Sequence, residues 1–72
     1  MMPAVGDQFH RLTEREREIA RSVAEGKTSP AIARDLNLSQ RTVDNHLGSI
    51  FKKLGLNTRT QLALLIASRR RR

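Results

Sequence analysis

Four residues spaced by four, three and four positions have side chains suited to contacting nucleic acid: Arg41, Asn45, Gly48 and Lys52. This spacing places them on one face of an α-helix. Arginine and asparagine can pair with base edges, lysine neutralises phosphate, and glycine adds no bulk that would hold a partner away. The opposite face has an apolar stripe with the same period, formed by Val43, Leu47, Ile50 and Leu54. A helix of roughly 15 residues is about 22 Å long and fits the DNA major groove. We therefore expect residues 40–54 to form a helix that packs through one side and meets duplex DNA with the other.

The start of this segment is expected to hold a phosphate. Unpaired N–H groups and the positive end of the helix dipole meet short polar side chains there. The predicted phosphate contacts are Thr28, Ser39, Gln40, Thr42, Lys52 and Lys53. Structural alternatives stay open, because Thr28 and Ser39 can cap helices and the two lysines suit the negative end of a helix.

Composition limits the classes of function. A chain of 72 residues makes one small domain, which buries only about 60% of its unfolded surface and leaves little room for a deep catalytic cleft. Cysteine is absent, which excludes a disulfide framework and a zinc-thiolate site. The longest apolar run, 62–67, is too short to cross a bilayer. His10 and His46 lack metal-ligand spacing, and no catalytic triad, P-loop or dinucleotide motif can be assembled. We expect a soluble, cytoplasmic protein that is not an enzyme and needs no cofactor or metal.

The net charge of +7 favours a polyanionic partner, although four of the positive charges lie in the run 69–72. That run is either a solvated tail or an arm that contacts phosphate. With two phenylalanines and no tryptophan or tyrosine, the chain lacks the aromatic platform on which single-stranded nucleic acids stack. Duplex DNA is therefore favoured over single strands.

The pattern predicts an all-α fold of four helices, because no segment alternates apolar and polar residues for long enough to form a strand. Residues 13–16 read T-x-x-E, a capping box that begins the first helix, and Gly26 ends it. Thr28 or Ser29 caps the second helix, with Pro30 in its first turn. Asn37 tolerates the left-handed conformation needed to leave that helix.

The third helix, 40–54, is expected to be capped by Ser39 and ended by Gly55. Asn57 or Thr58 caps the fourth, the latter with Gln61 as its capping-box partner, and this helix runs to about residue 68. Residues 1–11 show no periodicity and are expected to be a disordered leader or linker, and 69–72 a basic tail. The folded domain is thus predicted to span 12–68.

Residues 29–48 have the pattern of a helix-turn-helix unit. Such a unit needs a small residue where its helices cross most closely, and Ala33 supplies it. Apolar Ile32 and Leu36 flank this alanine, Asn37 forms the turn, and Val43 packs back from the second helix onto the first. The spacing indicates DNA binding, although any small helical bundle contains two helices and a turn.

Several motifs in fixed order resemble the LuxR/GerE-type DNA-binding domain over residues 12–68. The motifs that carry the resemblance are L-T-E-R-E-R-E-I at 12–19, E-G-K-T at 25–28, I-A-R-D-L at 32–36, L-S-Q-R-T-V-D-N-H-L at 38–47 and K-K-L-G-L at 52–56. The resemblance implies a four-helix domain whose third helix is the recognition helix of a bacterial transcriptional regulator. It also implies a role as the C-terminal output module of a longer chain with an N-terminal regulatory domain, associated with the nucleoid.

Transferred position by position, the resemblance and the exposed stripe together predict base contacts by Arg41, Asp44, Asn45 and Gly48. Many family members place lysine at position 44 and a larger polar or basic residue at position 48, so a readout by paired lysines cannot be carried over. Asparagine can pair with adenine, and aspartate can accept from the cytosine amino group. We expect Asn45 to read bases and Asp44 to select against wrong sequences. Alternatively, Asp44 faces solvent and pairs with a nearby basic side chain.

The fourth helix has two apolar sides. Leu62, Leu65 and Ile66 suffice to cover the core, and the second side continues through Ala63, Leu64 and Ala67. The resemblance implies that this second side makes a two-fold dimer, which places two recognition helices in major grooves about 10 bp apart. Alternatively, it packs on a domain of the parent protein.

Two other classes of function stay open. A helical adaptor would use the basic face for an acidic protein, and a steep salt dependence shared by unrelated duplexes distinguishes DNA binding from it. Binding to a membrane surface would need a free apolar helix face, whereas the apolar face of 40–54 is needed for the core.

Overall fold

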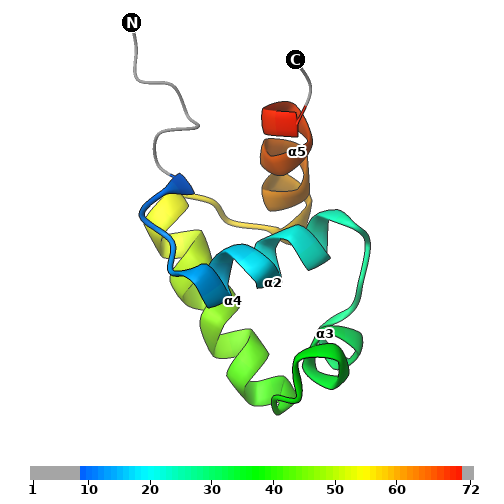
Figure 1. Ribbon diagram of the computed structural model, residues 1–72. Coiled ribbons are helices and arrows are strands. Elements are labelled where there is room, and N and C mark those ends of the chain that lie inside the picture. Colours follow the sequence, from blue (N-terminus) through cyan, green and yellow to red (C-terminus); the bar gives the residue numbers. More distant parts are fainter. Residues whose placement is uncertain (1–8, 71–72) are drawn as a thin grey trace, which may run out of the picture.

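The computed structural model describes residues 9–70, and these residues fold as helices joined by short turns (Figure 1). The helices are α2 (Glu14–Ala24), α3 (Ser29–Leu36), α4 (Gln40–Leu54) and α5 (Arg59–Arg70). Within this described part of the chain no strand is present. The predicted all-α architecture of four helices is confirmed.

Helix α2 lies at the centre of the fold and packs against both α4 and α5, while α3 packs against α4. In Figure 1 the turn between α3 and α4 lies at the lower end of the molecule, and α5 rises at the opposite end. Because α4 is held by two neighbours along one side, its other side is left to solvent.

The core draws on every helix of the described fold. Its largest fully buried side chains are Ile19 of α2, Ile32 of α3, Val43 and Ile50 of α4, and Leu62 of α5. All four members of the predicted stripe on α4 are buried, with at most 6% of each exposed. Leu36, Leu38 and Leu65 pack partly buried against this core. Burial of these apolar surfaces is the main source of stability in a fold without disulfides.

Local capping chemistry sets the first two helix boundaries. Thr13 Oγ1 accepts a hydrogen bond from the N–H of Glu16 at 3.1 Å, and Glu16 Oε1 accepts one from the N–H of Thr13 at 2.9 Å. The predicted capping box is confirmed. Of the two candidates for the second cap, Thr28 is the one used. Asn37 adopts the left-handed conformation (φ 59°, ψ 46°) that turns the chain from α3 into α4.

The last two helices also begin as predicted. Ser39 caps α4, which ends at Gly55 in the left-handed region (φ 69°). Before α5, the N–H of Gln61 donates to Thr58 Oγ1 at 3.1 Å and the N–H of Thr58 donates to Gln61 Oε1 at 3.2 Å. Thr58 is therefore the capping-box partner of Gln61.

The prediction that the leader extends through residue 11 is wrong at its end. Phe9 is only 6% exposed and belongs to the core, and its carbonyl oxygen accepts a hydrogen bond from the N–H of Leu12 at 3.1 Å. This turn folds the aromatic ring back onto the domain, which a search for helical periodicity cannot detect. At the other end α5 continues to Arg70, two residues into the predicted basic tail. Residues 1–8 and 71–72, on which the remaining leader and tail predictions fall, lie outside the described residues.

Candidate nucleic-acid interface

The side of α4 that faces away from the core carries the predicted base-contacting residues. We call this set the α4 outward face; its members, all exposed, are Gln40, Arg41, Asp44, Asn45, Gly48 and Lys52. None of them takes part in a hydrogen bond or ion pair that would tie it to another helix of the described fold. The face is therefore polar and uncovered, as the sequence predicts.

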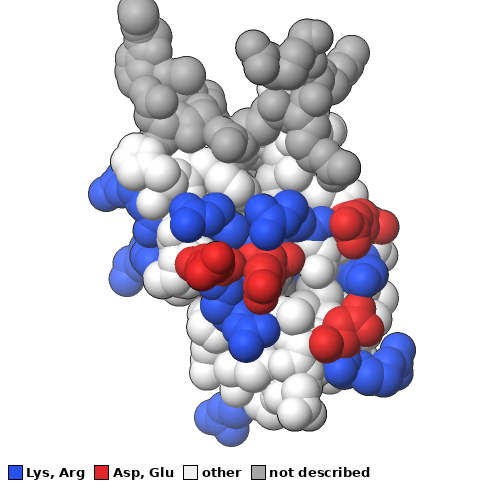
Figure 2. All heavy atoms as spheres, viewed as in Figure 1, with Lys and Arg blue, Asp and Glu red and all other residues white. Residues whose placement is uncertain are grey.

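The charges are unevenly spread over the surface. In Figure 2 the Asp and Glu side chains lie over α2 and toward α3, interspersed with Lys and Arg, while the left edge of the view, where α4 and the segment before α2 lie, shows Lys and Arg alone. Asp44 is the single acidic residue of α4. A polyanion would meet less repulsion along α4 than across α2.

The first turn of α4 is arranged to receive an anion. Ser39 Oγ accepts a hydrogen bond from the N–H of Thr42 at 3.0 Å, and the two hydroxyl groups lie 2.9 Å apart in a further hydrogen bond. No acidic side chain lies in this turn, and Gln40 and Arg41 point to solvent. The helix N-terminus thus keeps its positive partial charge uncompensated by the protein.

Thr28 also acts as a helix cap. Its Oγ1 accepts a hydrogen bond from the N–H of Ala31 at 3.3 Å, and the residue is exposed. A cap hydroxyl retains capacity for a further hydrogen bond, and a phosphate contact by Thr28 stays a prediction.

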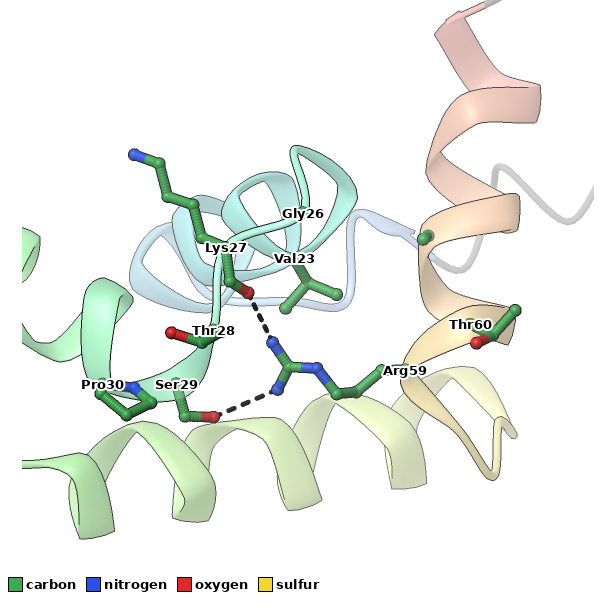
Figure 3. A pocket seen from close by; sticks show the side chains of 9 residues that line it. Val23, Gly26, Lys27, Thr28, Ser29, Pro30, Arg59 and Thr60 are labelled. Atoms are coloured by element: carbon green, nitrogen blue, oxygen red, sulfur yellow. Dashed lines mark hydrogen bonds between the residues drawn. The ribbon is translucent and has the colours of Figure 1, made fainter.

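Arg59 holds the corner in front of α3. From the first turn of α5 its guanidinium donates to Ser29 Oγ at 3.1 Å and to the carbonyl oxygen of Lys27 at 2.7 Å (Figure 3). It borders an open hollow between this corner and α5. The sequence carried no signal for this contact, which joins residues 30 and 32 positions apart.

The two lysines at the end of α4 have different surroundings. Lys52 is exposed on the α4 outward face, whereas the Lys53 ammonium lies 2.8 Å from Glu16 Oε1. Successive helix residues differ by about 100° in direction, which separates the pair. Phosphate contact by Lys53 stays a prediction, and its ammonium already has a carboxylate partner.

Glu16 is a buried carboxylate that joins α2 to α4, and it was not predicted. It is 4% exposed and accepts hydrogen bonds from the N–H of Thr13, from Ser49 Oγ at 2.8 Å and from Lys53 Nζ at 2.8 Å. We call Glu16, Ser49 and Lys53 the α2–α4 clamp. Ser49 and Lys53 lie four residues apart beside the apolar stripe of α4, a spacing that could have revealed them.

The clamp keeps Glu16 ionised. Burial raises the pKa of this carboxyl, but the hydrogen bonds from Lys53, the Thr13 backbone and Ser49, with the charge of Lys53, outweigh burial and lower the pKa from 4.5 to about 2. The orientation of α4 relative to α2 therefore rests on a charged contact as well as on apolar packing.

A second ion pair is exposed. Lys27 Nζ lies 2.8 Å from Asp35 Oδ2 and 3.9 Å from Glu25 Oε1. The hydrogen bond and charge of Asp35 raise the pKa of Lys27, and the same contact lowers the pKa of Asp35. Solvent screening makes such a surface pair a small contribution to stability.

The second apolar side of α5 is open to solvent. Leu64 is 64% exposed, Ala67 is exposed and Ala63 is half-buried, while Leu62 and Ile66 are buried in the core. The structure thus divides the helix as predicted, and nothing within residues 9–68 covers Leu64.

Other chemistries find no support in the part of the chain that the structure describes. Among those residues no three His, Cys, Asp or Glu side chains are grouped to hold a metal ion. His46 is half-buried at the edge of the α4 stripe. No described helix combines the length and apolar character needed to cross a membrane.

Comparison of the sequence with known proteins finds a family match. Residues 10–66 match the model described as "Bacterial regulatory proteins, luxR family". Similar proteins include the transcriptional regulatory protein YdfI of Bacillus subtilis, 50% identical over 50 residues that cover 69% of this chain and 24% of YdfI. The nitrate/nitrite response regulator protein NarP of Escherichia coli is 34% identical over 70 residues, covering 97% of this chain and 33% of NarP.

The spore germination protein GerE of Bacillus subtilis is 42% identical over 50 residues, which cover 69% of this chain and 68% of GerE. The matched segment thus spans about a quarter of YdfI and a third of NarP.

Proposed function

Since the chain belongs to the luxR family of bacterial regulatory proteins, whose helix-turn-helix domains bind DNA to regulate transcription, we propose that it acts as the output domain of a longer regulator and reads duplex DNA through α4. In this proposal α4 lies in the major groove with its outward face toward the bases. The buried stripe of the helix stays packed on the core.

The observation that carries the proposal is the difference between the two sides of α4. One side is sealed in the core, with Val43 and Ile50 fully buried, and the other exposes an unbroken row of polar residues and one glycine. A helix held rigidly from behind presents its outward side chains with little entropy left to lose on binding.

We assign base contacts to Arg41, Asp44, Asn45 and Gly48. Asn45 lies at the middle of the helix, where an amide can make two hydrogen bonds to adenine. The neighbouring Asp44 carboxylate accepts a hydrogen bond from the cytosine amino group, and its charge repels wrong base sequences at that position. The long side chain of Arg41 allows it to reach a base or a phosphate from the first turn.

We assign phosphate contacts to the positions that surround this centre, with the best supported in the first turn of α4. The side chains that contribute are Thr28, Ser39, Gln40, Thr42 and Lys52. They lie before and after the base-reading residues along the helix-turn-helix, as contacts that set register on the duplex do. Lys53 contributes charge, while its hydrogen bond to Glu16 fixes the helix.

Two copies are proposed to bind together through α5. The exposed Leu64 with Ala63 and Ala67 would form a self-complementary surface between the copies. We also propose an N-terminal regulatory domain in a longer parent protein, since this chain covers only 33% of the response regulator NarP. We propose a cytoplasmic, nucleoid-associated and non-enzymatic role, since the family consists of transcriptional regulators.

The experiment that tests this function is selection of duplexes from a random library by the purified 72-residue chain. The unchanged chain should enrich a defined sequence. Asn45→Ala should flatten the base preference, because one missing base contact removes roughly 1–3 kcal/mol of discrimination. Asn57→Ala is the matched control, since Asn57 is an exposed asparagine in the turn after α4. An unaltered preference in Asn45→Ala would reject the assignment of that residue.

A salt titration separates this function from the adaptor alternative. DNA binding predicts a linear fall of log affinity with log salt on any duplex, with an added component on the selected sequence. A protein whose basic face serves an acidic protein partner would enrich no sequence from the library. That result would remove the proposed function.

A further inference from the structure

The described fold has no structural requirement for glycine at position 48. Gly48 lies in the interior of α4 with its surface exposed, and a side chain built there would meet no atom within 4 Å. Its backbone is helical, in contrast to Gly26 (φ 89°) and Gly55 (φ 69°), which end helices in the left-handed region. Neither packing nor backbone conformation within the described fold calls for a glycine at this position.

A helix-interior glycine nevertheless weakens the domain. Glycine loses more backbone entropy on folding than alanine and is among the poorest helix formers. Alanine would fit the open space at Gly48 and would favour the helix. The missing side chain therefore indicates that a binding partner approaches the backbone of α4 closely at this position.

The neighbouring residues indicate why close approach matters. Asp44 and Asn45 have the short side chains of the α4 outward face and lie one turn before Gly48, whereas the long side chains of Arg41 and Lys52 lie toward the two ends. A short side chain reaches a base edge only if the helix backbone itself comes near the groove floor. A side chain at position 48 would project from the same face and meet the bases first.

We infer that Gly48 is a specificity-determining residue, whose bare backbone seats the centre of α4 against the base edges so that Asp44 and Asn45 can reach them. The inference rests on the proposed function. It adds that the missing side chain at position 48 contributes to sequence discrimination. Base edges that protrude into the groove, such as the thymine methyl group, fit against the helix backbone at this point.

The test compares Gly48→Ala and Gly48→Leu with the unchanged chain, on the selected duplex and on an unrelated duplex. We expect Gly48→Ala to raise the melting temperature by a few degrees, because the helix gains a better former. Its affinity for the selected duplex should fall about tenfold, and that of Gly48→Leu should fall to the level of the unrelated duplex. Affinity for the unrelated duplex, which depends on phosphate contacts, should change by less than about twofold.

Ser22→Ala on α2 is the matched control. It exchanges a half-buried helical serine for alanine without altering charge, and should leave both affinities unchanged. If Gly48→Ala binds the selected duplex as tightly as the unchanged chain, the inference is overturned while the proposed function stands. A lower melting temperature for Gly48→Ala would also overturn it, since the glycine would then serve the fold. If the unchanged chain prefers no duplex, the proposed function fails and the inference fails with it.

Discussion

Replacing Glu16 with glutamine tests whether the α2–α4 clamp holds the DNA-reading helix in place. The pKa of Glu16 falls from 4.5 to about 2 in the folded protein, which corresponds to about 3 kcal/mol of stabilisation for the ionised form. Glutamine keeps the shape of the side chain and one acceptor oxygen, but it lacks the negative charge that faces the Lys53 ammonium. We therefore expect Glu16→Gln to lose about 2–3 kcal/mol of unfolding free energy at pH 7.

The effect should depend on pH with a definite sign. A carboxyl whose folded pKa is lower than its unfolded pKa stabilises the protein fully above the unfolded value, and this stabilisation is lost as the pH falls toward the folded value. For Glu16 the window runs from 4.5 down to about 2. As the pH falls across this window, the unfolding free energy of the unchanged chain should approach that of Glu16→Gln.

Urea unfolding followed by circular dichroism measures both effects. Glu14→Gln is the matched control, because Glu14 is an exposed glutamate in the same first turn of α2 and shares only the interaction with the helix dipole. The unfolding free energy that Glu14→Gln loses should stay below about 1 kcal/mol. The reasoning is refuted if the two variants are equally stable at pH 7, or if the gap between Glu16→Gln and the unchanged chain stays constant down to pH 2.

Two further predictions concern binding. Leu64→Glu should abolish cooperative binding to a probe with two half-sites and leave the melting temperature nearly unchanged, since Leu64 is 64% exposed; intact cooperativity in a gel-shift titration would remove the α5 dimer. Lys52→Ala should weaken binding to all duplexes alike and reduce the slope of log affinity against log salt by about one. If instead it changes the preferred sequence with the slope unaltered, Lys52 contacts a base and not a phosphate.

The parts of the fold that were predicted correctly depend on nearby residues. Capping by Thr13, Thr28 and Ser39, the left-handed Asn37 and the buried stripe of α4 all follow from side chains within about one or two turns of each other. Helical periodicity also sorted the polar and apolar sides of α4. Such features can be predicted because their causes are contained in a short segment.

The parts that were missed depend on how helices are placed relative to each other. Glu16 meets Ser49 and Lys53 across 33 and 37 positions, and Arg59 meets Ser29 across 30. Phe9 belongs to the core through the turn that precedes α2, outside the apolar stripes from which the core was predicted. Both Lys52 and Lys53 were likewise predicted as phosphate contacts, although the next position along the helix directs Lys53 toward Glu16.

The most direct test of DNA binding through the α4 outward face is an NMR titration of the isotopically labelled chain with its selected duplex. We expect the largest amide shift changes along α4, at Arg41, Asp44, Asn45 and Gly48, and at Ser39 and Thr42 at its start. Amides of the exposed side of α2 should change little. Large changes confined to α2 or α5, with the amides of α4 unmoved, would contradict the account.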